Sequence, residues 1–483
     1  MKDARAGRGR ARDLGNWVHA RFVFPGIVHL RGEGGLFSVL DELRAVERMP
    51  AERLAERQRE RLAEMLGYAR THSPYYRDRW PRLERVGPRE AEEVLAGLPC
   101  ITKVDLREHV EEMRARPGPR RVTRKITGGS TGQAVTVYKD RAAVAREMAA
   151  SWLGYGWFGI GVGDRAARFW GSPHSLKRRL RFAAADFAMH RVRFSAFAFD
   201  EADLEGYWSR CLDFRPQYLY GYVSMLVEFA AFLRRRGYDA SALGLRAVVT
   251  TSEVLSEPQR KLLGEVFDAP VQNEYGCGEV GPIAYECERG GLHVMSENLR
   301  VELLGEDGRP VGPGESGEVV VTDLNNRAMP LVRYRLGDFG VWGGPCPCGR
   351  GFPVLEKVWG RAYDFVQLPS GRRCHGEYFM YLFEDLRGSG VDVEQFQVVQ
   401  AGERELDVAV VVKSTLGGDV EHRVHEALRE RVKGMAVTVR RVPAIRRAPS
   451  GKMRVILNPW LHPDTADRGT VPPQAASSPS RDP

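Results

Sequence analysis

The stretch from about residue 205 to 300 constrains the fold most, because helical and strand patterns alternate along it. Helices are expected at 206–214, 223–236 and 257–267, and short strands at 217–220, 246–251 and 271–274. This alternation favours βαβ units and a largely parallel sheet. Ligands of such sheets bind beyond the carboxyl ends of the strands. Polar residues that directly follow these strands are therefore candidate site residues.

The flanking segments predict further structure. Residues 51–72 place Leu54, Leu62 and Leu66 among alternating charges, which indicates an amphipathic helix on a core. Thr102 or Asp105 could cap a further helix. Short strand patterns at 301–326, joined by Gly, Pro and Asp turns, favour antiparallel β-structure.

We therefore expect an α/β protein with two folded domains. A large domain of residues 16–359 would combine parallel-rich sheets with antiparallel β elements, and a small mobile α+β domain would span 360–460. Residues 1–15 are predicted to be a solvated basic arm, and the Pro-, Ser- and Asp-rich residues 461–483 a disordered tail.

The charge balance does not favour nucleic acid as a partner. The chain has 72 Lys and Arg against 63 Asp and Glu, a net charge of +9 that is mild for 483 residues. Such an excess suits an anionic ligand such as a nucleotide. Because no recognition-helix, zinc-finger or basic–aromatic repeat pattern accompanies it, no DNA or RNA binding is expected.

The N-terminus and the cysteines favour a cytoplasmic protein. The basic start is followed by Phe22–Leu30, which Pro25 and Gly26 interrupt and which is too short to span a bilayer. No signal-peptide cleavage site follows, so neither a leader nor a transmembrane segment is expected. Seven cysteines, an odd number, favour reduced thiols or metal ligands over a disulfide framework.

The run Thr127-Gly-Gly-Ser-Thr-Gly132 is the first candidate site. Its three glycines would let the backbone approach a charged ligand with N–H groups directed at it. Its Thr and Ser side chains add hydroxyl donors for phosphate oxygens. The run lacks the Gly-Lys-Ser/Thr ending of a Walker loop. A phosphate grip and an ordinary hairpin turn fit this pattern equally well.

Two motifs directly follow predicted strands, namely Thr250-Thr-Ser-Glu253 and Asn273-Glu-Tyr-Gly-Cys-Gly-Glu279. Both lie where a parallel sheet places its ligands. Tyr275 could stack on a purine, and Glu279 offers Mg²⁺ a carboxylate while phosphates complete the shell. An ordinary polar loop is the alternative for each.

Three later motifs carry complementary chemistry. Asp338, expected on a tight turn after Tyr334-Arg-Leu-Gly, could accept two hydrogen bonds from ribose hydroxyls. Arg361 follows Gly360 at the change in composition. Lys452 follows Ser-Gly on a predicted mobile loop, where it could contact a carboxylate and a phosphate together as a point charge.

In this order, the six motifs resemble the adenylate-forming superfamily, which includes acyl-CoA synthetases, luciferases and peptide-synthetase adenylation domains. The resemblance extends from about Leu62 to Leu457 and is strongest to the phenylacetate–CoA ligase-like and CapK-like branch. Four segments carry this finer resemblance: Ala69–Tyr76, Leu98–Lys103, Tyr220–Tyr222 and Tyr275–Cys287.

The resemblance implies a role for each motif. Tyr275 would pack on adenine, Glu279 would serve Mg²⁺, and Lys452 would catalyse adenylation. The glycine-rich run would hold the β- and γ-phosphates. Ser252 and Glu253 would border the adenine, and Asp338 and Arg361 would bind ribose. The implied nucleotide-binding set is Thr127, Gly128, Gly129, Ser130, Thr131, Gly132, Ser252, Glu253, Asn273, Glu274, Tyr275, Gly276, Asp338 and Arg361.

Two positions depart from the family pattern. The family's loop continues Gly-Lys-Pro, whereas Gln133 and Ala134 stand here, so one phosphate contact is absent. The family's C-terminal domain rotates about a hinge that carries Asp or Lys. Here Tyr363 stands at that position, with Asp364 behind it.

Cys287, His293, Cys346 and Cys348 form a separate constellation. Three thiolates and one imidazole are a complete tetrahedral ligand set for structural Zn²⁺. The Cys-x-Cys spacing is tighter than usual, and reduced loop cysteines are the alternative. A similar arrangement in the phenylacetate–CoA ligase-like branch favours zinc.

The resemblance implies ATP-dependent activation of a carboxylic acid, aryl or acyl, as an acyl-adenylate, with release of pyrophosphate and transfer to CoA. Transfer to an amine, giving an amide, is the runner-up. A non-catalytic nucleotide-binding assembly protein that keeps the fold is the alternative of another class. The presence of Lys452, Glu279 and Asp338 argues against that alternative. A homodimer is left open.

The sequence does not specify the acid. Seven aromatic residues line an aromatic pocket or belong to the core: Tyr155, Trp157, Phe158, Phe169, Trp170, Tyr220 and Tyr222. The basic run Lys177–Arg181 either meets CoA phosphates or forms a solvated surface.

Overall fold

A computed structural model gives the structure of the chain and divides it into two compact units, the second of which holds the described residues from 365 onward. The described residues are 17–80, 86–127, 135–171, 183–196, 198–305, 307–359, 365–375, 378–379, 382–383, 385–386, 391, 393–412, 419–445 and 455–460. We call the two parts the large unit and the small unit.

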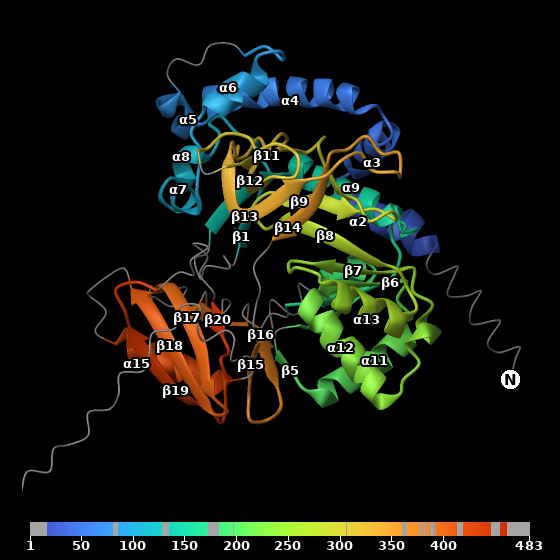
Figure 1. Ribbon diagram of the computed structural model, residues 1–483, viewed down its shortest axis with the longest axis vertical. Coiled ribbons are helices and arrows are strands. Elements are labelled where there is room, and N and C mark those ends of the chain that lie inside the picture. The colour runs from blue at the N-terminus through green and yellow to red at the C-terminus, as the bar shows by residue number, and fades with distance from the viewer. Residues whose placement is uncertain are drawn as a thin grey trace, which may run out of the picture. The chain divides into compact units, whose positions relative to one another are not determined.

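The described part of the large unit begins with a run of helices, alternates strands and helices in its middle, and ends with a run of strands (Figure 1). Its helices include η1 (His19–Val23), α2 (Phe24–Leu30), α3 (Leu36–Val46), α4 (Ala51–His72), α5 (Pro74–Arg79), α6 (Ala91–Gly97), α7 (Lys103–Glu108), α8 (Val110–Met113), α9 (Arg141–Gly156), α11 (Glu201–Phe214), α12 (Val223–Arg236), η2 (Ala240–Leu243) and α13 (Glu257–Phe267). Its strands include β1 (Val122–Thr127), β2 (Val135–Asp140), β3 (Ala166–Trp170), β4 (Arg191–Ser195), β5 (Ala198–Phe199), β6 (Tyr218–Tyr222), β7 (Ala247–Thr251), β8 (Val271–Cys277), β9 (Gly281–Glu286), β10 (Leu292–Val294), β11 (Leu299–Leu304), β12 (Ser316–Asp323), β13 (Tyr334–Trp342) and β14 (Val354–Trp359).

Among the described residues, eleven strands form one mixed sheet in the order β11-β12-β13-β14-β10-β9-β8-β7-β6-β3-β4. The strands from β4 to β8 are parallel to their neighbours, and those from β8 to β11 are antiparallel. Strands β1 and β2 pair separately as an antiparallel hairpin. The expected α/β class with parallel and antiparallel β-structure is confirmed, and the parallel strands and the antiparallel strands belong to one mixed sheet.

Helices cover both faces of the parallel strands, as buried parallel sheets require. Helices α12 and α13 contact β6, β7 and β8. On the other face, α9 packs with α2 and α3 over the strands in a second core that includes Phe24, Leu40, Trp152 and Val249. The helices from α4 to α6 pack over the antiparallel strands in a further core, with Leu62, Leu66 and Tyr76 among its buried residues.

Most expected elements of the large unit are present with small shifts. The helices predicted at 51–72, 223–236 and 257–267 have these bounds. Thr102 and Asp105 both take part in capping α7, through a reciprocal capping box. The helix predicted at 206–214 instead begins at Glu201, because Asp200 and Asp203 form a capping box that the prediction missed.

The small unit contains a hairpin and a four-stranded sheet. The hairpin consists of β15 (Phe365–Gln367) and β16 (Arg373–His375). The sheet has the order β19-β18-β17-β20, from β17 (Val393–Gly402), β18 (Glu405–Val412), β19 (Ala436–Arg441) and β20 (Ile456–Leu457). Helix α15 (Val420–Arg431) contacts β19 and buries Val424 and Leu428. This agrees with the expected α+β composition.

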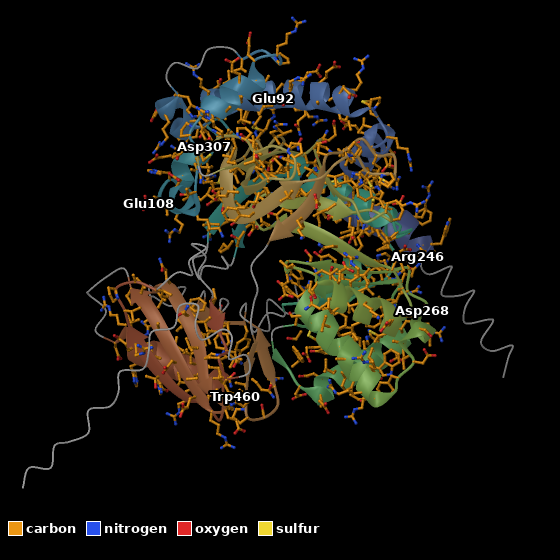
Figure 2. The ribbon with its side chains drawn as sticks, viewed as in Figure 1. Glu92, Glu108, Arg246, Asp268, Asp307 and Trp460 are labelled. Atoms are coloured by element: carbon orange, nitrogen blue, oxygen red, sulfur yellow. The ribbon has the colours of Figure 1, made fainter. Side chains whose placement is uncertain are left out.

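Charged side chains such as Glu108 and Asp268 lie exposed at the outer surface of the large unit (Figure 2). Within the described ranges, every helix is too short or too polar to cross a membrane.

A buried ion pair joins three segments of the large unit. Arg333, which is 4% exposed, donates to both carboxylate oxygens of Glu302 at 3.0 and 3.3 Å, and its Nη1 donates to the Ala96 carbonyl at 2.9 Å. These bonds connect β11, the residue before β13, and α6. A buried ion pair with one partner removed leaves an uncompensated charge.

We therefore expect Arg333→Met to destabilise the protein by about 3–5 kcal/mol, because the Glu302 carboxylate stays buried without its cation. Urea unfolding followed by circular dichroism measures this change. Arg309→Met is the control, because the Arg309 side chain is 85% exposed and pairs with an exposed Asp307. Equal midpoints for the two variants would contradict the importance of the buried pair.

Candidate functional site

Glu279 lies in the turn between β8 and β9, and it is only 4% exposed. Its Oε1 accepts hydrogen bonds from the Tyr334 hydroxyl at 3.2 Å and from the Thr127 hydroxyl at 3.3 Å. The Lys103 ammonium lies 3.8 Å from the same oxygen. The carboxylate is therefore held where β1, β13 and the start of α7 meet.

The environment of Glu279 keeps it ionised. Burial by itself would raise the pKa of Glu279, but the Lys103 ammonium and hydrogen bonds, including that from Tyr334, hold this pKa below its ordinary value. Burial raises the pKa of the neighbouring Cys277 to about 12, so this side chain stays a neutral thiol. An ionised carboxylate is the form that a hard cation such as Mg²⁺ binds.

Gly278 allows the end of β1 to approach the turn that holds Glu279. A Cβ atom on Gly278 would lie 2.4 Å from Cγ2 of Thr127, which is closer than real Cβ contacts come. Thr127 is the first residue of the glycine-rich run. It thus brings the start of this run to the Glu279 carboxylate.

Tyr275 and Asp338, predicted separately, contact each other. The Tyr275 hydroxyl donates to Oδ2 of Asp338 at 3.1 Å. Asp338 lies inside β13 and not on a separate tight turn, at a place where the pairing with β12 shifts between Arg335 and Phe339. Such bulges redirect side chains and increase local twist. The structure therefore brings the proposed adenine and ribose partners together.

Ser252 and Glu253 follow β7 as predicted, but their side chains differ in role. Ser252 has a left-handed backbone with φ of 68°, which turns the chain after the strand. The Glu253 carboxylate accepts hydrogen bonds from the Ser224 backbone N–H at 2.6 Å and from its hydroxyl at 2.9 Å. It thereby satisfies donors at the start of α12. A role for both residues beside adenine remains a prediction.

Glu274 is buried in a hydroxyl network. Its carboxylate accepts hydrogen bonds from Tyr155 at 2.9 Å, Tyr220 at 3.0 Å and Thr251 at 2.9 Å. Burial, followed by the Glu274 charge, raises the pKa of both tyrosines, so both remain donors. Asn273 accepts a hydrogen bond from Thr250 at 3.4 Å, and Gly276 lies in β8 beside Tyr275.

The seven aromatic residues named above separate into groups. Trp170 stacks on Tyr222 and Tyr220 with ring centroids 4.5 and 5.7 Å apart, and the Arg168 guanidinium lies 4.5 Å from the Trp170 ring. Phe169 is fully buried and packs on Phe194 and Phe229 in the core. Trp157 packs edge-on against His293, so it supports the cysteine–histidine cluster.

Several predicted residues lie outside the described residues. These are Gly128, Gly129, Ser130, Thr131, Gly132, Gln133, Arg361, Tyr363, Asp364, Lys452 and the run Lys177–Arg181. Their roles stay predictions.

The single motifs do not predict the position of Lys103. In the sequence Lys103 belongs only to the segment Leu98–Lys103 that carries the resemblance, yet its ammonium lies 3.8 Å from Glu279. Its helix position gives the available signal. Thr102 caps α7, so Lys103 is the first residue of that helix and its backbone position is fixed by the cap.

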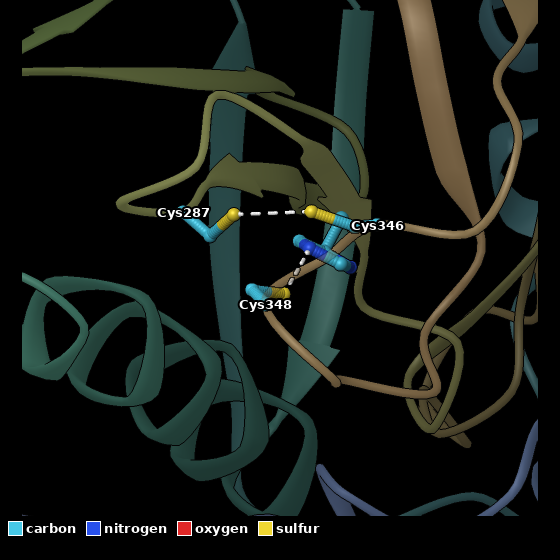
Figure 3. Close-up of side chains that lie close together, drawn as sticks. Cys287, Cys346 and Cys348 are labelled. Carbon is cyan, nitrogen blue, oxygen red and sulfur yellow. Dashed lines mark hydrogen bonds between the residues drawn. The ribbon is translucent and has the colours of Figure 1, made fainter.

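The predicted cysteine–histidine set gathers in space (Figure 3). The donor atoms of Cys287, His293, Cys346 and Cys348 all lie within 4.8 Å of one another. Cys287 Sγ is 3.6 Å from Cys346 Sγ, and Cys348 Sγ is 3.2 Å from His293 Nε2. Tetrahedral Zn²⁺ with ordinary bond lengths separates its ligand atoms by about 3.4–3.8 Å. The donor set and its spacing therefore fit this ion.

The surroundings orient these ligands. His293 is fully buried, and its Nδ1 contacts the Phe352 carbonyl at 3.2 Å, which leaves Nε2 directed at the sulfurs. Backbone N–H groups of Arg289 and Arg350 donate to Cys287 and Cys348 at 3.4 and 3.5 Å. The cluster connects the β9–β10 hairpin with the segment between β13 and β14.

Comparison with characterised proteins supports the resemblance, although no family model matches the chain. Phenylacetate-coenzyme A ligase of Thermus thermophilus is 27% identical over 463 residues, which cover 86% of this chain and 98% of that protein. Protein CapK of Staphylococcus aureus is 24% identical over 325 residues, which cover 65% of this chain and 69% of that protein.

Solved structures agree in fold. The chain matches 2-hydroxyisobutyryl-CoA ligase, solved with an acyl-adenylate and CoA, with a TM-score of 0.57 and 20% identity over 85% of this chain and 91% of that protein. The structural match shows that the chain shares the fold of this ligase, and the sequence comparisons show that the chain is similar to proteins of the phenylacetate–CoA ligase-like and CapK-like branch, as the motifs predicted.

Proposed function

We propose that the protein is an AMP-forming acid ligase that activates a carboxylic acid with ATP and transfers the acyl group to CoA. The observation that carries this proposal is that the predicted Mg²⁺, adenine and ribose partners lie close together at the end of β8. Ionised Glu279 meets the end of β1, and Tyr275 contacts Asp338. The relatives named phenylacetate-coenzyme A ligase support the same chemistry.

In the proposed first step, an oxygen of the substrate carboxylate bonds to the α-phosphorus of ATP, and the bond from that phosphorus to pyrophosphate breaks. Both reactants are anions, so positive groups and hydrogen-bond donors must stabilise the charge. Mg²⁺ bound at Glu279 would neutralise phosphate oxygens. Tyr275 and Asp338 would orient adenine and ribose, and Lys452 would contact both the carboxylate and the α-phosphate.

In the proposed second step, the sulfur of CoA attacks the acyl carbon and AMP leaves. The family changes the orientation of its C-terminal domain between the steps. We propose that a small domain of residues 360–460 reorients in the same way, while residues 16–359 form a separate large domain. The cytoplasmic location and a homodimer also remain predictions.

Pyrophosphate exchange across aryl, fatty and amino acids tests the first step, and adding CoA or an amine to the active acid identifies the acceptor. Pyrophosphate exchange followed by formation of an amide, and of no thioester, would favour the amide ligase. ATP binding without exchange for any acid would favour the non-catalytic assembly protein.

We expect Lys452→Ala to lower acid-dependent pyrophosphate exchange by about 10²–10³-fold while ATP binding persists, because a charge that stabilises the transition state is lost. Lys433→Ala is the matched control, since Lys433 is an exposed lysine of the small unit. Exchange at the wild-type rate in the Lys452 variant would refute the assignment.

Lys103 supplies a second test, because it places a positive charge beside Glu279. We propose that it helps to hold the triphosphate, where the family's loop lysine is replaced by Gln133. Lys103→Ala should lower kcat/KM for ATP roughly tenfold to a hundredfold, and Lys103→Arg should restore much of it. Steady-state kinetics measures both.

The exposed Lys261 on α13 gives the control for this experiment, as Lys261→Ala. A Lys103→Ala enzyme with unchanged kinetics for ATP would show that the ion pair with Glu279 has no part in nucleotide use.

We also propose that Cys287, His293, Cys346 and Cys348 bind one structural Zn²⁺. The four protein donors complete a tetrahedral shell, so the ion would stabilise the fold and take no part in the reaction. The proposal is supported by the mutual distances of the donors and by the contact that orients His293.

Metal analysis of the purified protein should find about one zinc per chain. Cys346→Ser should reduce this content and lower the melting temperature, whereas Cys100→Ser, outside the cluster, should change neither. Zinc well below one equivalent in the wild-type protein, or full zinc retention in Cys346→Ser with unchanged melting, would contradict the site.

A further inference from the structure

The helical turns of residues 17–30, which include η1 and α2, are apolar on two sides. On the inner side, Phe24 and Val28 are 1% and 2% exposed and pack in the core with α3 and α9. On the outer side, Val18, Phe22 and Leu30 are 40%, 60% and 87% exposed. A surface helix normally turns charged or polar residues to water, so the outer side is unusual.

Two more aromatic residues extend this outer side. Trp17 is 57% exposed, and its ring lies 5.6 Å from that of Phe22. Phe187 is 71% exposed, and its ring lies 6.1 Å from that of His19 in η1. We call Trp17, Val18, Phe22, Leu30 and Phe187 the N-terminal apolar face.

The face is a concentration of apolar surface and not a chance exposure. Among the described residues, eleven large apolar side chains are exposed, and five of them form this face. The other six belong to six separate segments of the chain. Single exposed apolar residues are normal on soluble proteins, whereas a contiguous group indicates an interaction surface.

The sequence around the helix carries positive charge. Between Asp13 and Glu33 the sequence has no acidic residue, and the exposed Arg21 and Arg31 lie within and directly after the helix. In the sequence, residues 1–13 precede this helix with five Lys and Arg against two Asp. Exposed Trp and Phe together with Lys and Arg are the composition of helices that lie in the interface of anionic membranes.

We propose that the N-terminal apolar face binds the protein to the surface of an anionic membrane. A helix of this length measures about 21 Å, so it would lie in the plane of the interface and not cross the bilayer. Charge selects this occupant over a second copy of the chain, because two copies would bring like positive charges together whereas anionic lipids complement them. The proposal does not depend on the proposed enzymatic activity.

Sedimentation of the full chain with lipid vesicles tests the proposal. The protein should pellet with vesicles of phosphatidylcholine that contain roughly one-third phosphatidylglycerol, should bind pure phosphatidylcholine much more weakly, and should dissociate as salt is added. Phe22→Ser combined with Leu30→Ser should reduce the bound fraction about tenfold or more, because two inserted side chains are lost.

Leu212→Ser combined with Val254→Ser is the matched control, since these residues are 43% and 45% exposed and lie outside the face. All variants should melt as the wild type does, because the replaced side chains are exposed. Trp17 reports insertion directly. Vesicles should shift the fluorescence of the wild type to shorter wavelength, and Trp17→Phe should lose most of this shift while it still pellets.

Three results would overturn the proposal. The first is a wild-type protein that pellets with neither vesicle. The second is binding that the Phe22/Leu30 variant retains in full. The third is a wild-type protein that does not bind vesicles but forms a dimer in sedimentation equilibrium without lipid, when the Phe22/Leu30 variant is a monomer. This result would assign the face to a second copy of the chain.

Discussion

The contact between the end of β1 and the β8–β9 turn is the constraint on which the candidate site depends. β1 belongs to a separate hairpin, whereas the turn joins two strands of the eleven-stranded sheet, so among the described residues no strand pairing connects them. The missing side chain of Gly278 lets Thr127 come close, and its hydroxyl then reaches Glu279 at 3.3 Å. The first residue of the glycine-rich run therefore contacts the carboxylate that would bind Mg²⁺.

The change of strand direction at β8 explains why the other parts of the site meet there. The parallel strands end at a common edge, which is where β7 and β8 deliver Ser252 and Tyr275. The antiparallel strands run back along the same sheet, and the irregular pairing of β13 turns Asp338 toward Tyr275. The cysteine–histidine cluster lies among these antiparallel strands, so a bound ion would stiffen the half that presents Asp338.

The sequence predicted the elements well where local patterns decide them and predicted contacts poorly where distant segments decide them. Helices α4, α12 and α13 have the expected bounds because apolar periodicity defines them. The position of Lys103 beside Glu279 and the burial of Glu274 among Tyr155, Tyr220 and Thr251 depend on tertiary packing. The order of the motifs was the strongest signal for the resemblance to the family, because it can be read from the sequence without any of these contacts.

Residues 22–30 also show that the sequence does not determine which side chains of a helix are buried. Pro25 and Gly26 suggested an interrupted run, yet Pro25 lies in the first turn of α2, where its missing N–H costs little. The helix therefore continues through both residues. Hydropathy alone cannot tell which side of such a helix faces the core, because Phe22 and Phe24 are equally apolar. Because Phe24 and Val28 pack against α3 and α9, Phe22 and Leu30 stay exposed to water. Exposed apolar side chains next to positive charges are what an anionic membrane surface would bind.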